Sequence, residues 1–217
     1  MTKTKEILLL SSSLSTIIAS SIWIYVTQFA TPAFNVPLHQ RVGEVLAQET
    51  ARLIHTQGQV VVVTMDTSKE PELKAQMQVF EKTLKTLGPI GIKELPVDTE
   101  DKPHYRTGAG LSSRRFLRIV KKSTGAAAIV SFIGAPRLNE AELEQLQTTP
   151  KFVAECRSPD KIKNLFEKNV LQVAVINRFE YPAPIKHNPK TPKQWFEKYY
   201  QVVTTNNADI LPRNAGD

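Results

Sequence analysis

The sequence has only one cysteine and none of the short motifs that mark common catalytic and metal centres. One cysteine excludes an internal disulfide framework and any cysteine-rich zinc or iron–sulfur site. There is no Cys-x-x-Cys-His, no His-Glu-x-x-His, no EF-hand loop, no Gly-x-Ser-x-Gly and no P-loop. We therefore expect no metal and no cofactor, and these absences favour a protein that is not an enzyme.

Charge is missing from one long stretch, because no Lys, Arg, Asp or Glu occurs between Glu6 and Arg41. Within it, an apolar run covers residues 7–29, and a helix of that length rises about 34 Å, enough to cross a hydrocarbon core of about 30 Å. Serines make the run only moderately apolar, but their hydroxyls can bond to carbonyls of the preceding turn. Trp23 and Tyr25 are placed where a membrane interface favours aromatic rings. The sequence predicts a transmembrane signal-anchor helix over 7–29.

The charges that flank this run predict its orientation. Lys3 and Lys5 precede it, whereas the ten residues after it hold no Lys or Arg. The positive-inside rule then leaves residues 1–6 in the cytoplasm and places the C-terminal domain outside, in the periplasm of a bacterium with a single pass through the inner membrane. The alternative is a cleaved signal peptide, for which Ala19, Ser20 and Ser21 offer small residues.

After a linker at 30–39, helical and strand periodicities alternate. The continuous β-branched run at 60–65 is typical of a strand buried on both faces. Further strands are expected at 90–97, 126–132, 151–155 and 171–177. Helices are expected at 40–56, 70–87, 111–122, 139–147 and from 158. The pattern predicts an α/β domain over 40–180 whose mostly parallel, doubly wound sheet of about five strands is flavodoxin-like or Rossmann-like.

Prolines dominate the segment that follows, so residues 181–205 are expected to form a proline-rich strap and a C-terminal helix, with a flexible tail at 206–217. The helix carries four aromatic residues, which are Trp195, Phe196, Tyr199 and Tyr200. One helix cannot bury all its faces in the same core, so part of this cluster is expected to contact a partner. The alternative is a helix clamped onto the sheet.

Ligands of open α/β sheets bind at the carboxyl ends of the strands. The candidate ligand-binding residues at those ends are Asp66, Thr67, Ser68, Asp98, Thr99, Gly134, Arg157, Ser158 and Arg178. Such a rim, with two arginines and a helix start, suits a small anion or a polyhydroxy compound. Turns at strand ends use the same residue types without any ligand, and that alternative stays open.

Two other features carry chemistry. Cys156 is a weak candidate nucleophile, because a thiol beside Arg157 and a helix start can have a lowered pKa, although a cysteine at the end of a strand is usually an inert apolar residue.

The helix at 111–122 is basic, through Arg114, Arg115, Arg118, Lys121 and Lys122. An anionic membrane surface or an acidic membrane-protein subunit suits this helix better than nucleic acid, and a solvated face is the alternative.

Residues 42–66 show a helix, a glycine, a buried strand and an acid at the strand end. This stretch resembles the opening unit of sugar-type (class 1) periplasmic binding proteins, and residues 126–134 are similar to their later strand-and-glycine turns. The resemblance implies the fold of a single lobe of such a protein, since the domain is long enough for one lobe only.

Three functional hypotheses follow. The first is a membrane-anchored, extracytoplasmic domain that serves as a non-catalytic interaction or accessory subunit of an inner-membrane assembly. The alternative is a binding or sensor module that holds a small anion or sugar at the strand-end rim. The third is an enzyme that depends on Cys156.

Overall fold

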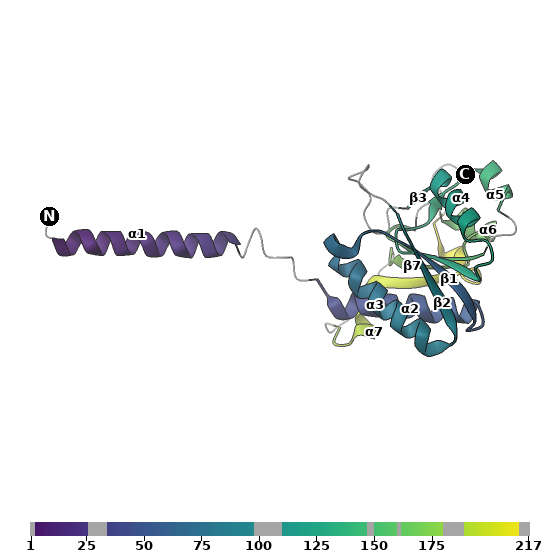
Figure 1. Cartoon of the computed structure of the whole chain (residues 1–217), viewed down its shortest axis with the longest axis horizontal. Coiled ribbons are helices and arrows are strands. Elements are labelled where there is room, and N and C mark those ends of the chain that lie inside the picture. The colour runs from purple at the N-terminus through teal and green to yellow at the C-terminus, as the bar shows by residue number, and fades with distance from the viewer. Residues whose placement is uncertain are drawn as a thin grey trace. The chain divides into compact units, whose positions relative to one another are not determined.

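The computed structural model describes residues 3–25, 34–97, 110–146, 150–159, 162–179 and 189–212. The chain divides into two compact units, Met1–Phe34 and Asn35–Asp217 (Figure 1). The proline-rich strap at 181–188 and the rim candidates Asp98 and Thr99 lie outside the described residues.

The first unit contains one helix, α1 (Lys3–Ile24). Its large apolar side chains from Leu14 to Tyr25 are exposed, Trp23 among them. The Thr16 hydroxyl donates to the Ser12 carbonyl over 2.9 Å. Among the residues that the structure describes, no helix combines the length and the apolar character needed to cross a membrane. The predicted transmembrane span therefore finds no support here, and residues 26–29 of it lie outside the described part.

A six-stranded sheet forms the centre of the second unit, in the order β2-β1-β4-β6-β7-β8. Its strands are β1 (Gly58–Thr64), β2 (Ile90–Pro96), β4 (Ala128–Ser131), β6 (Lys151–Cys156), β7 (Val173–Asn177) and β8 (Tyr200–Thr204). The first five pair in parallel, and β8 runs antiparallel to β7. All four residues of β4 are buried, as expected for a strand covered on both faces. The predicted mostly parallel α/β sheet is confirmed, with β8 as an additional strand.

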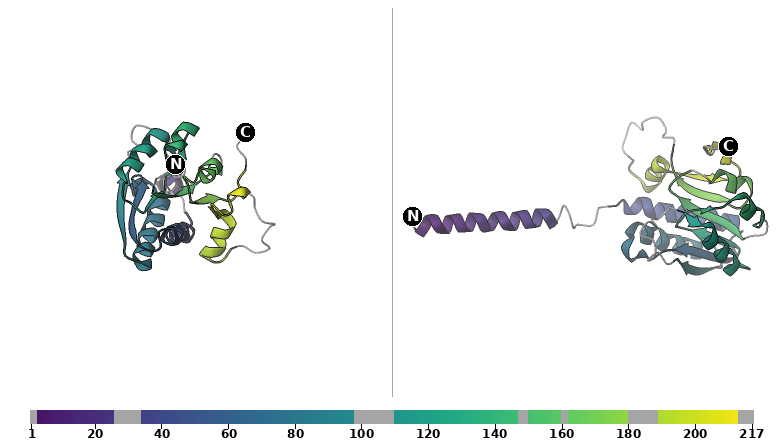
Figure 2. Two further views of the ribbon diagram at one scale, coloured as in Figure 1. Left: turned by 90° about the vertical axis from the view of Figure 1, so that its right-hand side faces the viewer. Right: turned by 90° about the horizontal axis from the view of Figure 1, so that it is seen from above.

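Helices cover both faces of this sheet (Figures 1 and 2). The chain passes from β1 to β2 on one side of it, and then from β2 back to β4 on the other side. Because both crossovers are right-handed, the helices of the first connection and those of the later connections lie on opposite faces of the sheet. One face carries α2 (Val36–Leu53), α3 (Pro71–Leu87) and α7 (Pro192–Tyr199), and the other carries α4 (Ser113–Lys122), α5 (Glu140–Glu144) and α6 (Lys163–Glu167). Edge-to-face ring pairs join Phe80 to Phe132 on the first face and Phe116 to Phe152 on the second.

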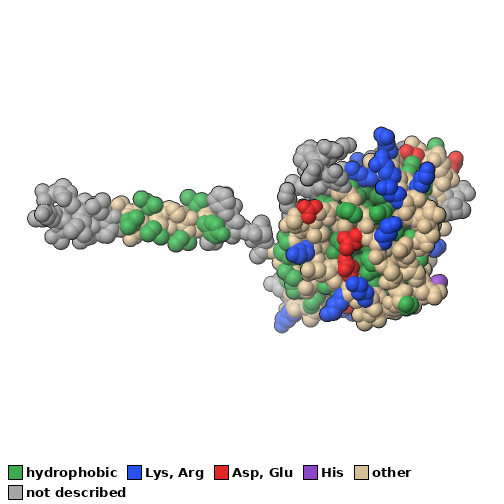
Figure 3. Space-filling model, in the orientation of Figure 1, with side chains coloured by type: hydrophobic (Ala, Val, Ile, Leu, Met, Phe, Trp, Pro, Cys, Tyr) green, Lys and Arg blue, Asp and Glu red, His purple; other side chains and the backbone are tan. Residues whose placement is uncertain are grey.

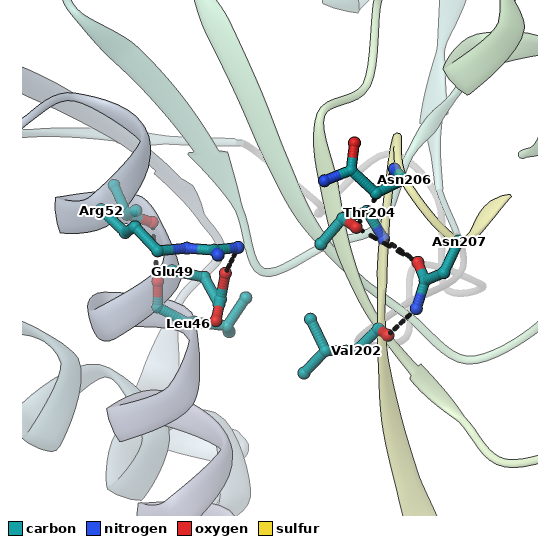
Figure 4. A network of polar contacts seen from close by, with 8 residues as sticks. Leu46, Glu49, Arg52, Val202, Thr204, Asn206 and Asn207 are labelled. Carbon is teal, nitrogen blue, oxygen red and sulfur yellow. Dashed lines mark hydrogen bonds and ion pairs between the residues drawn. The ribbon is translucent and has the colours of Figure 1, made fainter.

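Smaller elements complete the domain. β3 (Leu111–Ser112) and β5 (Pro136–Arg137) form a short parallel pair, and the 3-10 turns η2 (Thr67–Lys69) and η3 (Ala208–Ile210) follow β1 and β8. At the end of β8, the Asn207 side chain accepts from the Thr204 backbone N–H at 2.6 Å and donates to the Val202 carbonyl at 3.2 Å (Figure 4). This network fixes β8 at the end opposite to Tyr200.

Helix starts follow capping chemistry closely. The predicted capping box of Asn139 and Glu142 is present at α5. Asn35 caps α2, which tolerates Pro37 in its first turn, so this helix begins at Val36, inside the expected linker. In contrast, Ser158 does not start a helix, because α6 begins only at Lys163 and its N-cap makes no side-chain hydrogen bond.

The C-terminal segment differs from the prediction in two ways. Tyr200 belongs to β8 rather than to the aromatic helix, which ends at Tyr199. Part of the expected flexible tail is packed, because Leu211 is buried and its carbonyl accepts from the Lys163 ammonium at 3.1 Å. Residues 213–217 lie outside the described part of the chain.

Candidate functional site

The structure places the described rim residues at one edge of the sheet, because β1, β4, β6 and β7 are adjacent and parallel. After β1, the Asp66 carboxylate accepts from the Ser68 backbone N–H at 2.9 Å and from the Ser68 hydroxyl at 2.7 Å. Thr67 lies half-buried between them. These contacts shape the η2 turn, as the turn-forming alternative predicts.

The other rim residues have different surroundings. Gly134 is buried at a φ of 120°, and its carbonyl accepts from the Ser131 hydroxyl at 2.7 Å. Arg157 and Ser158 are exposed. Arg178 donates through Nε to the Glu197 carbonyl at 3.0 Å and through Nη2 to the Tyr200 carbonyl at 3.3 Å. Arg178 therefore ties β7 to α7 and β8 and contributes to the architecture of the edge.

A buried polar group lies at the same edge, on the face covered by α2 and α3. We call His39, Gln76 and Glu155 the Glu155 cluster. The Gln76 amide Nε2 donates to Glu155 Oε1 at 3.0 Å and lies 3.3 Å from His39 Nδ1. Glu155 is only 5% exposed, although it carries a carboxyl group in the middle of the core. The cluster joins β6 to α3 and α2.

Burial dominates the electrostatics of this cluster. It raises the pKa of Glu155 to about 7, against the opposing effects of the Gln76 hydrogen bond and the Arg157 charge. It also lowers the pKa of His39, against the opposing charge of Glu72, whose Oε1 lies 3.9 Å from His39 Nε2. Burial therefore favours the neutral form of both groups.

The unsatisfied atoms indicate the same protonation state. Within the described residues, Glu155 Oε2 and Gln76 Oε1 are buried acceptors without a hydrogen-bond partner. A protonated Glu155 would carry one O–H donor in place of an unpaired acceptor, which lowers the cost of burying this carboxyl group. We infer that Glu155 is the neutral acid in the folded protein below about pH 7.

A cavity of about 270 Å³, which we call the β7 cavity, lies next to this cluster and is lined by Leu38, Asn177, Tyr199 and Tyr200. Asn177 pairs with Tyr200 across β7 and β8, and Glu155 pairs with Val175 one strand away. Because side chains alternate along a strand, Asn177 lies on the same sheet face as Glu155. Burial raises the pKa of Tyr200, and the nearby charge of Glu155 raises it further. The charge of Glu155 therefore affects the pKa of a residue that lines the cavity.

The aromatic C-terminal segment is only partly available to a partner. Phe196 is buried, which clamps α7 onto the domain, whereas Trp195 and Tyr199 are half-buried. Their rings stack with centroids 5.7 Å apart, and the Lys198 ammonium lies 5.8 Å and 5.3 Å from the two centroids. Partner binding by this pair stays a prediction.

Cys156 ends β6 as a buried residue, 3% exposed. Burial raises the pKa of its thiol to about 12, so only about one thiol in ten thousand is ionised at pH 8. We expect native protein to resist alkylation by N-ethylmaleimide for hours, whereas protein unfolded in urea reacts within minutes. Mass spectrometry of timed samples measures this, and rapid alkylation of the native thiol would restore Cys156 as a candidate nucleophile.

The described residues place no three His, Cys, Asp or Glu side chains where they could hold a metal ion. Of the basic residues of α4, Arg115 is half-buried, and the other four are exposed, namely Arg114, Arg118, Lys121 and Lys122.

No protein-family model and no curated protein sequence matches this chain. Its fold does match solved structures. A solute-binding protein of an ABC transporter from Burkholderia graminis, in complex with D-arabinose, is 14% identical at a TM-score of 0.53, over 81% of this chain and 62% of that one. A sugar-binding protein from Bacillus halodurans is 14% identical at 0.53, over 80% and 64%. The arabinose-binding protein AraP from Geobacillus stearothermophilus is 13% identical at 0.52, over 81% and 63%.

These identities show a likeness of fold alone. The chain spans less than two thirds of the length of each of these proteins, at 62%, 64% and 63%. The resemblance that the sequence predicts is confirmed at this level: the chain has a fold similar to part of these sugar-type solute-binding proteins.

Proposed function

We propose that the second unit is a small-molecule binding or sensor domain, and that its ligand is a small polyhydroxy compound such as a monosaccharide held in the β7 cavity. The observation that carries the proposal is the position of this cavity, at the carboxyl edge of a doubly wound sheet, with two tyrosines and an asparagine in its lining. Ligands of open α/β sheets bind at this edge. Support also comes from the similar structures, of which one is in complex with D-arabinose.

The lining favours a neutral polyol over the small anion that the sequence also allows. Asn177 and the two tyrosines are residue types that donate and accept hydrogen bonds, and Leu38 adds an apolar side chain to the lining. Among the described residues, the lining includes no cation, and Arg178 is bonded to two backbone carbonyls. An anion would also be repelled by Glu155 once that group is ionised.

A ligand on one lobe remains partly in contact with water, so we expect weak binding, with Kd on the order of 1 mM. Titration of the protein with D-arabinose, D-xylose and D-glucose, followed by the NMR shifts of ligand and protein, measures it. Asn177→Ala should weaken binding about tenfold, because it removes hydrogen bonds to ligand hydroxyls.

Asn206→Ala is the matched control, since Asn206 is exposed at the far end of β8 and should leave the affinity unchanged (Figure 4). Equal affinities of the Asn177 and Asn206 variants would contradict the placement of the ligand in this cavity. If sugars, polyols, carboxylates and phosphates all failed to bind at about 10 mM, the proposed small-molecule binding function would be contradicted.

We further propose that this domain lies outside the cytoplasm on an N-terminal membrane anchor and serves as an accessory subunit there. The setting is inferred from the apolar run at 7–29 with Lys3 and Lys5 before it. The half-buried Trp195 and Tyr199 pair favours contact with a second subunit. Alkaline phosphatase fused after the domain should be active in bacteria, because it matures only outside the cytoplasm. An inactive fusion of full expression would contradict this setting.

A further inference from the structure

Helix α4 has an unusual charge distribution. Its ten residues, Ser113–Lys122, include five cations and no acid. Phe116 and Ile119 are its buried residues and pack into the core. Arg114, Arg118 and Lys121 recur at spacings of four and three, so they form one stripe along the exposed side of the helix, about 10 Å long. Lys122 lies beside the last of them and is also exposed.

No acid of the described residues forms a salt bridge with these four cations. The salt bridges between residues of the described ranges lie on α2, α3 and α7. The exposed Arg137 extends the surface, because it pairs with Ser112 directly before α4. Figure 3 shows Lys and Arg side chains gathered over the region of α4. Among the described residues, these exposed cations form a basic surface on the outside of the domain without an ion-pair partner.

We propose that this basic stripe, formed by Arg114, Arg118, Lys121 and Lys122, is a docking surface for an anionic phospholipid bilayer. A bilayer presents a plane of negative charge, so a straight stripe of exposed cations can engage it at every position without a preformed pocket. The stripe supplies charge and nothing else, since the large apolar residues of α4 face the core or are half-buried.

Two other classes of partner fit this surface less well. Single-stranded nucleic acid is held by cations together with exposed aromatic rings on which bases stack, and the one aromatic residue of α4, Phe116, is buried. A stable protein partner requires an apolar or aromatic anchor at the centre of the contact, and the stripe has none. A bilayer needs neither feature.

Docking through α4 also leaves the β7 cavity accessible. Phe116 of α4 contacts Phe152 on one side of β6, whereas Gln76 of α3 contacts Glu155 on the other side. The cavity is lined from the second side by Leu38 of α2 and by the end of α7. Membrane contact and ligand binding therefore use opposite faces of the sheet, and this proposal is independent of the proposed ligand.

Flotation of the full chain with vesicles tests the proposal. Phosphatidylcholine vesicles are compared with vesicles that contain about one quarter phosphatidylglycerol, at low and at about 0.3 M salt. Because the apolar residues of α1 can bind both kinds of vesicle, the measured quantity is the gain in binding that phosphatidylglycerol produces. We expect a gain on the order of 100-fold at low salt, which the high salt abolishes.

The variant R114Q/R118Q/K121Q/K122Q should lose this gain and keep its thermal stability, since all four side chains are exposed. The matched control K74Q/K82Q/K85Q/K93Q removes the same charge from exposed positions on α3 and β2 and should keep the gain. An equal loss in both variants, a gain that resists salt, or the absence of any gain in the wild type would each overturn the proposal. Binding of an oligonucleotide in place of vesicles would also overturn it.

Discussion

Replacing Glu155 with glutamine is expected to raise the free energy of unfolding by about 3 kcal/mol at about pH 8 and to change it little at about pH 4. Burial raises the pKa of the Glu155 carboxyl to about 7 in the folded protein. A glutamine keeps the shape and the hydrogen-bonding amide partner, but it never has to ionise inside the core. Urea unfolding at a series of pH values, followed by circular dichroism, measures the difference.

The sign follows from proton binding. Between the unfolded pKa of 4.5 and the folded pKa of about 7, the folded protein holds a proton on Glu155 that the unfolded chain has lost. The stability that Glu155 contributes is therefore fully present below 4.5 and is lost as pH rises to about 7. His39 acts in the opposite sense, because its pKa is lowered and its contribution is lost as pH falls below 6.5. Because His39 is present in both proteins, its contribution largely cancels when the free energy of unfolding of the wild type is subtracted from that of the variant.

Several charged or titratable groups lie around this carboxyl, and the experiment has to separate them. They are His39 from α2, Glu72 from α3, Cys156 and Arg157 from the end of β6, and Tyr200 from β8. The exposed Glu167→Gln serves as the matched control and should leave the slope of stability with pH as in the wild type. A Glu155→Gln protein with the wild-type slope would show that folding leaves the pKa of Glu155 unchanged.

The sequence predicts the sheet well because its parallel strands are buried on both faces. Runs such as 60–65 have to be continuously apolar and β-branched, so local composition reports their tertiary position. The extra strand β8 is not predictable in this way. It begins immediately after α7, and Tyr199 and Tyr200 continue the aromatic spacing of that helix, so only the pairing with β7 reveals where the helix ends.

The candidate site is less predictable, because its partners are distant along the chain. Gln76 is 79 residues from Glu155 and 37 from His39, and no local pattern connects them. One signal is in the sequence: Glu155 is an acid among the apolar residues of the buried part of β6, and a charge at such a position requires a partner or a proton. Arg178 follows the carboxyl end of β7, but its bonds to two carbonyls depend on α7 and β8, which the sequence does not connect to it.

Gly43 to alanine is expected to lower the free energy of unfolding by about 3 kcal/mol, although the change adds one methyl group to a helix and raises helix propensity. α2 crosses α3 at this glycine. A Cβ at Gly43 would lie 2.0 Å from the Gln76 backbone oxygen, and a backbone atom cannot move aside as a side chain can. The two helices therefore have to separate, which also shifts Gln76 away from Glu155 and His39. Urea unfolding measures the loss.

Gly91→Ala, on the edge strand β2, is the matched control, because the atoms nearest to its added Cβ, Gln59 Cα and Gly58 O on β1, are 4.0 Å away. It should change the free energy of unfolding by less than about 1 kcal/mol. The cluster gives a second readout, since a shift of Gln76 removes the hydrogen bond that opposes the upward displacement of the Glu155 pKa. In the Gly43 variant, the fall of stability with rising pH should therefore extend to a higher pH than in the wild type. An unchanged stability and pH profile would mean that α2 and α3 can separate at this crossing without loss of packing, and that the cluster does not depend on their close approach.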